Sequence, residues 1–122
     1  MTAMTATGRV LEVDTWLNDE AAAAGTVVEC HPEISFAELN GGLPVPYGKK
    51  TWAGHHLRRD LLEKAGIVVP ADLGTAGERG APDDVLDAAA AAWTARRVAT
   101  GAARSLPDRP EPFGDRRAAI VY

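Results

Sequence analysis

The chain has 122 residues, a net charge of −4 at neutral pH and 46% hydrophobic residues, which suits one domain with enough apolar side chains for a core. Its acidic balance lacks the basic footprint of a dedicated nucleic-acid binder, although metal ions can bridge acidic residues to phosphate. The single cysteine, Cys30, excludes an intramolecular disulfide framework. The sequence has no run of 18 apolar residues, and its start lacks the apolar segment of a signal peptide, so we expect a cytoplasmic protein without a membrane partner.

Residues 8–25 are predicted to form a helix. Val10, Val13 and Leu17 follow a helical spacing, and Gly25 is a plausible stop. An alternative reads "RVLEVD" as a strand ending at Asp14. Its alternation is imperfect and Leu17 extends the helical period, so we favour the helix.

A strand is predicted at residues 25–30, because β-branched residues precede Pro32, which cannot donate to a ladder. Glu29 then lies near the carboxyl end of a strand, where open α/β sheets tend to place functional groups. Cys30 is expected to be a half-buried strand residue. Residues 33–39 are predicted to form a short helix, and the glycines and prolines of "NGGLPVPYG" mark a loop.

The segment "TWAGHHLRRDLLEKAG" predicts a third helix, with Leu57, Leu61 and Ala65 four residues apart. Its polar side chains are expected on an exposed face: His55, His56, Arg58 and Arg59. Lys49 and Lys50 precede this helix. They could contact phosphate, neutralise acidic residues, or belong to a solvated loop.

Residues 67–69 are a third candidate strand, followed by flexible loop. A long helix is predicted from Pro82 to about residue 100, with acids in its first turn and Gly101 after it. Leu86 and Trp93, seven residues apart, are expected to face the core. A proline-rich connection, "SLPDRPEPFGD", should lead to a terminal strand at residues 118–122.

The long helix opens with an acidic cluster. Asp87 is four residues from Asp83 and three from Asp84, so it can share a helical face with either. Magnesium or manganese, which prefer oxygen ligands, would suit the cluster if Glu29 approached it. The alternative is that Asp83 and Asp84 only complement the helix dipole.

Three blocks resemble consecutive signature blocks of the domain of unknown function 429 family, a family of predicted RNase H-like nucleases: "VVECHPEISFAELNGG", "KKTWAGHHLRRDLL" and "DDVLDAAAAAWTARRVATG". The resemblance implies a partial RNase H-like α/β fold with three or four helices, in which acidic residues hold Mg²⁺ or Mn²⁺ for phosphodiester cleavage. The acids that it implies are Glu29, Asp87 and Asp84 as catalytic residues, with Asp83 as a further metal ligand.

The same resemblance places His31 and Glu33 in the family's His-Pro-Glu step. We expect Lys49, Lys50 and His31 to contact a nucleic-acid substrate. The chain resembles only the carboxyl-terminal half of an RNase H-like domain, because the first strand and its aspartate have no counterpart. We therefore expect an impaired nuclease that forms a homo-oligomer or receives the missing half from a separate chain. A non-catalytic assembly or binding module is the alternative.

Overall fold

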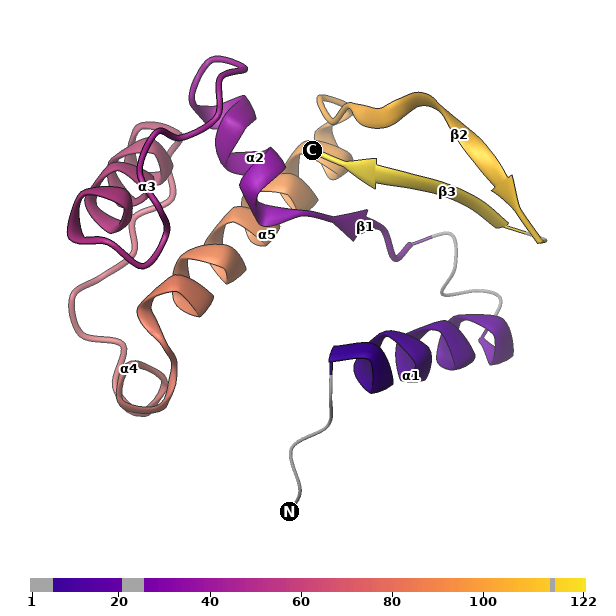
Figure 1. Cartoon of the computed structure of the whole chain (residues 1–122), viewed down its shortest axis with the longest axis horizontal. Coiled ribbons are helices and arrows are strands. Elements are labelled where there is room, and N and C mark those ends of the chain that lie inside the picture. Colours follow the sequence, from indigo (N-terminus) through magenta and orange to yellow (C-terminus); the bar gives the residue numbers. More distant parts are fainter. Residues whose placement is uncertain (1–5, 21–25, 115) are drawn as a thin grey trace.

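The computed structural model describes residues 6–20, 26–114 and 116–122, and within them the chain forms five helices and one three-stranded sheet. The element order is α1 (Ala6–Asp19), β1 (Glu29–Cys30), α2 (Pro32–Leu39), α3 (Trp52–Lys64), α4 (Thr75–Arg79), α5 (Pro82–Thr100), β2 (Ser105–Phe113) and β3 (Arg116–Val121). Figure 1 shows α2, α3 and α5 grouped together, with the sheet beside them and α1 below the strands. The α/β class is confirmed, and no helix in the described ranges is long and apolar enough to cross a membrane.

The first helix carries apolar side chains that face solvent. It ends at Asp19, whereas the sequence predicted a helix to Gly25; residues 21–25 lie outside the described part of the chain. Asp14 lies within α1, so the strand alternative is wrong. The Asp14 carboxylate accepts a hydrogen bond from Arg116 of β3, while Val10 is 70% exposed. The contact of α1 with the sheet is therefore an ion pair between Asp14 and Arg116, and the apolar side chains of α1 contribute little packing.

The long helix α5 has the ends that its sequence predicts. Pro82 occupies the first turn, where its missing N–H costs no intrahelical bond. Gly101 follows the helix at φ 75°, a left-handed conformation that glycine adopts without strain. The local sequence is therefore sufficient to fix both boundaries.

The core lies between α2, α3 and α5. Its fully buried apolar side chains come from all three helices: Phe36, Leu62, Leu86 and Ala90. Trp93 is also buried, which confirms the predicted core face of α5. Ser35 Oγ and Thr94 Oγ1 lie 2.7 Å apart across the α2–α5 contact, so each buried hydroxyl has a partner.

The sheet has the strand order β1-β3-β2. β1 pairs in parallel with β3, placing Glu29 opposite Ile120, and β2 pairs antiparallel with β3. Within the predicted strand 25–30, the described residues 26–30 form a strand only at Glu29 and Cys30, and residue 25 lies outside the described part of the chain. The terminal strand begins at Arg116 rather than residue 118, and Tyr122 forms two backbone hydrogen bonds with Arg104, of 2.7 and 2.9 Å.

The proline-rich connection is itself a strand, β2, which corrects the sequence prediction. Proline lacks an N–H donor and is tolerated at edges and irregularities of a sheet. β2 is an edge strand, and its register shifts between Leu106 and Glu111. Pro107 and Pro110 lie within this irregular stretch, where the regular pattern of backbone hydrogen bonds between β2 and β3 is interrupted, so their missing N–H donors are tolerated.

The segment between α3 and α5 also differs from the prediction. Residues 67–69 form no strand. Ile67 and Val69 pack against the core. The Val69 carbonyl accepts a hydrogen bond of 2.7 Å from Arg59 Nη2, so this carbonyl is satisfied by a side chain and not by a neighbouring strand. The stretch predicted as flexible loop contains the short helix α4, which raises the helix number above the expected three or four.

Candidate functional site

The loop between α2 and α3 lies against the first turns of α5. Lys49 Nζ lies 3.4 Å from Asp87 Oδ2 and 3.6 Å from Asp83 Oδ2. Lys50 Nζ lies 3.4 Å from the same Asp83 oxygen. Asp83 and Asp87 share one face of the helix, as their spacing predicted. Of the alternatives left open for the two lysines, neutralisation of the acidic cluster matches this geometry.

The lysines change the acid–base behaviour of this cluster. The Asp83 side chain is only 10% exposed. Burial alone would raise the pKa of its carboxyl. Hydrogen bonding and charge from Lys50, then a backbone hydrogen bond, then the charge of Lys49 together outweigh burial and lower this pKa. The Asp87 carboxylate, with a smaller effect from Asp83, raises the pKa of Lys49. Both changes favour the charged forms and hence the ion pairs.

Cys30 connects the end of β1 to the same helix. Its thiol is half-buried, as predicted, and burial raises its pKa. The negative charges of Asp87 and Glu29 raise this pKa further. The end of β1 is followed directly by α2, which packs against α5 through the Ser35–Thr94 contact. Glu29 itself is exposed.

Two predicted site residues lie at the surface without side-chain contacts to this cluster. Asp84 is exposed, and within the described ranges its carboxylate has no ion-pair partner; this agrees with a role in complementing the helix dipole. His31 is exposed just before α2. Its carbonyl accepts hydrogen bonds from the backbone of Ile34 and Ser35, while its imidazole does not cap the helix.

Arg58 is the residue that sequence reasoning placed wrongly. Its side chain is 2% exposed, whereas an exposed helix face was predicted. Nε donates to Glu33 Oε1 at 3.1 Å and Nη2 to Glu33 Oε2 at 2.8 Å, a two-point ion pair. Nη1 donates to the carbonyls of Tyr47 and Gly54, at 2.7 and 3.1 Å. The Glu33 of the His-Pro-Glu step is thereby linked through Arg58 to the loop that carries the lysines.

The loop is also fixed at the start of α3. Thr51 Oγ1 accepts a hydrogen bond from the Gly54 N–H and donates one to the Gly48 carbonyl. A side chain at Gly54 would place its Cβ 1.9 Å from the Gly48 oxygen, so this close approach requires glycine. In the sequence, the contact between Gly54 and Gly48 is indicated only weakly, by a glycine three residues after the capping Thr51.

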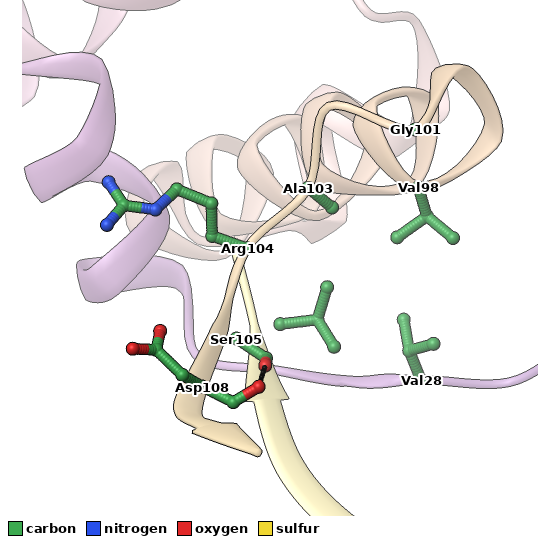
Figure 2. Close-up of a pocket in the computed structure, with 8 residues that line it drawn as sticks. Val28, Val98, Gly101, Ala103, Arg104, Ser105 and Asp108 are labelled. Atoms are coloured by element: carbon green, nitrogen blue, oxygen red, sulfur yellow. Dashed lines mark hydrogen bonds between the residues drawn. The ribbon is translucent and has the colours of Figure 1, made fainter. Parts of the chain in front are cut away.

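A separate open hollow of 460 Å³ lies at the other end of α5. Figure 2 shows Val28 of the segment before β1 facing Val98 of α5 across the hollow, with Arg104, Ser105 and Asp108 around it. Ser105 Oγ donates to the Asp108 carbonyl at 3.3 Å. The hollow is therefore lined by both apolar and polar residues, and it is distinct from the acidic cluster at the start of α5.

The family described as "Protein of unknown function (DUF429)" matches residues 2–112. The chain belongs to the DUF429 family. The DUF429 match contains β1, α2, α3 and α5 in full, and with them the whole acidic and lysine cluster. No curated protein and no solved structure matches the chain.

The carboxylates that would hold the divalent metal implied by the DUF429 resemblance are already paired with lysines. Mg²⁺ keeps several of its waters and is usually held by one or two carboxylates that are open to it. Carboxylates of the right chemistry are present, but among the described residues no group of three or more His, Cys, Asp or Glu side chains could hold a metal ion. Asp83 and Asp87 share the Lys49 ammonium instead. These residues alone do not fit Mg²⁺ or Mn²⁺.

Proposed function

We propose that the chain contributes the strand-end and helix portion of an RNase H-like phosphodiester-cleaving centre that acts on nucleic acid. The observation that carries the proposal is that β1, which ends beside Glu29, leads directly into α2, and α2 packs on α5, the helix that presents Asp83 and Asp87 on one face. The topology supports it, because β1 and β3 are parallel strands joined through helices. The family resemblance of the blocks containing Glu29 and Asp87 supports it further.

The two lysines have different roles in this proposal. Lys49 contacts both Asp83 and Asp87 and offsets the repulsion between two carboxylates on one helical face. Lys50 has one contact, at 3.4 Å from Asp83, and its side chain is 78% exposed. Exposed ion pairs are weak, so a phosphate group can compete for Lys50. We assign Lys50 to contact with the phosphate backbone.

The proposed centre requires a further carboxylate. Among the described residues β1 has β3 as a strand partner on one side only, and a strand that pairs with the other side would end near Glu29. We propose that a second chain supplies this strand and its carboxylate. Without them the charge that holds and positions Mg²⁺ or Mn²⁺ is reduced, so the isolated chain should cleave slowly.

The test is a cleavage assay of the purified full chain on a labelled oligonucleotide with Mn²⁺. We expect slow cleavage that falls about tenfold or more in Asp87→Asn and is retained in Asp60→Asn, which alters an exposed α3 carboxylate paired with Lys64. Equal cleavage by the three proteins would overturn the proposal, because Asp87 would then take no part.

A non-catalytic assembly module is the second candidate, and one observation favours it: lysines already neutralise both carboxylates. In such a module Asp87→Asn would change only stability, and Glu29→Gln would change neither stability nor Mn²⁺ binding. Absence of cleavage by the wild-type chain together with these results would favour the module over the nuclease.

A further inference from the structure

Trp52 presents an unusually open aromatic ring at the start of α3. Its exposed fraction is 80%, whereas tryptophan side chains are on average highly buried. The ring stacks on His56, with centroids 5.4 Å apart and planes inclined by 26°. His56 lies one helical turn further along, so α3 itself supports the indole. The surface that His56 leaves uncovered is open to solvent.

The charge around this ring is locally positive in an acidic chain. Residues 47–59 contain four Lys and Arg residues and no Asp or Glu. Lys49, Arg58 and Arg59 are engaged with Asp87, Glu33 and the Val69 carbonyl. Lys50, two residues before Trp52, is paired with Asp83 at 3.4 Å, but its side chain is 78% exposed, so a phosphate can compete for it.

We propose that Trp52, supported by His56, is a stacking platform for one base of a single-stranded nucleic acid, with Lys50 contacting a neighbouring phosphate. Stacking on an aromatic ring needs a free base face, which a single strand offers and a regular duplex does not. A contact between protein chains would also use an exposed tryptophan, because protein interfaces are enriched in aromatic residues, and the binding assay distinguishes the two. The inference extends the proposed function by naming the strandedness of the substrate.

The geometry of the loop makes this platform rigid. Thr51 caps α3, and the close contact between Gly54 and Gly48 fixes the chain on both sides of the ring. A rigid aromatic side chain loses little conformational entropy when a base stacks on it. Binding therefore requires little reorganisation of the protein.

Binding is tested by fluorescence anisotropy of a labelled oligothymidylate of about 10 nucleotides, in EDTA so that cleavage takes no part. We expect Trp52→Leu to weaken binding by about fivefold to a hundredfold, the usual loss for one stacked base. Trp16→Leu is the matched control, because this α1 tryptophan is 48% exposed and lies outside the platform. Trp52→Phe should restore part of the affinity, and a duplex of the same length should bind more weakly than the single strand.

Unchanged binding by Trp52→Leu would refute the proposal, as would tighter binding of the duplex. If Trp52→Leu instead dissociates an oligomer seen by light scattering and leaves oligonucleotide binding intact, the ring belongs to a contact between chains and the proposal is wrong. The cleavage assay varies Asp87 and this assay varies Trp52. The two proposals can therefore fail independently.

Discussion

The reactivity of the Cys30 thiol is expected to depend on the charge of Asp87. Burial, then Asp87, then Glu29 raises its pKa, so at pH 8 a smaller fraction is thiolate than in a free peptide, and alkylation by iodoacetamide should be slow. Removing the nearby charge by Asp87→Asn lowers this pKa. We expect alkylation about twofold faster in this variant, measured by mass spectrometry of the folded protein.

The control for this experiment is Asp60→Asn, which removes a carboxylate that does not act on the thiol. Its alkylation rate should equal that of the wild type. An Asp87→Asn rate that also equals the wild type would show that the charge of Asp87 does not act on the Cys30 thiol.

Individual site residues differ in how far the sequence could predict them. The shared face of Asp83 and Asp87 follows from helical spacing alone, which is local. The burial of Arg58 could not be predicted in this way, because its partners Glu33 and the Tyr47 carbonyl belong to other segments. A positively charged residue on a polar helix face has no local signal of a buried ion pair. Only the packing of α2 against α3 creates it.

At the scale of elements, the contact between the loop and α3 depends on one missing side chain. A Cβ at position 54 would lie 1.9 Å from the Gly48 oxygen and 2.8 Å from Arg58 Nη1. Gly54→Ala must therefore displace the loop or the arginine. We expect it to destabilise the fold by about 2–3 kcal/mol, measured by urea unfolding.

Gly48→Ala is the matched control on the other side of this contact. Its Cβ would meet only Thr51 Cγ2, at 3.7 Å, which is an ordinary contact distance. We expect a change within about 0.5 kcal/mol. Equal destabilisation by the two substitutions would show that the close approach of Gly54 is not what holds the loop.

The helices and strands differ in how well the local sequence predicts them. The boundaries of α5 were predictable because Pro82 and Gly101 act within one turn of the helix ends. β2 was missed because proline content suggested a connection, while an edge strand with an irregular register tolerates proline. Residues 67–69 have strand-like composition, but tertiary contacts of Ile67 and Val69 with the core decide their conformation.

At the scale of the whole molecule, self-association is predicted from the side of β1 that has no strand partner among the described residues. Val27 and Val28 are 38% and 43% exposed beside this strand, and Val28 lines the apolar hollow next to it. Open strand edges with apolar neighbours favour pairing with another chain. We expect the full chain to form a dimer or a larger closed oligomer at micromolar concentration, measured by light scattering.

A lysine at the edge is the direct test of this surface, because a charge there opposes strand pairing. Val28→Lys should shift the protein to a monomer. Val10→Lys is the control, since Val10 is 70% exposed on α1 and away from β1. A monodisperse wild-type monomer, or loss of the oligomer in both variants, would contradict the predicted interface.

The parallel pairing of β1 with β3 also has a consequence for the order of folding. The helices α2, α3 and α5 can form their core from contiguous sequence, since α5 precedes β2 and β3 in the chain. β1 has no strand partner in the described chain until β3 has been synthesised, and closing so long a loop is entropically slow. During translation the helical core should therefore assemble first, while β1 stays available to chaperones or to a neighbouring nascent chain.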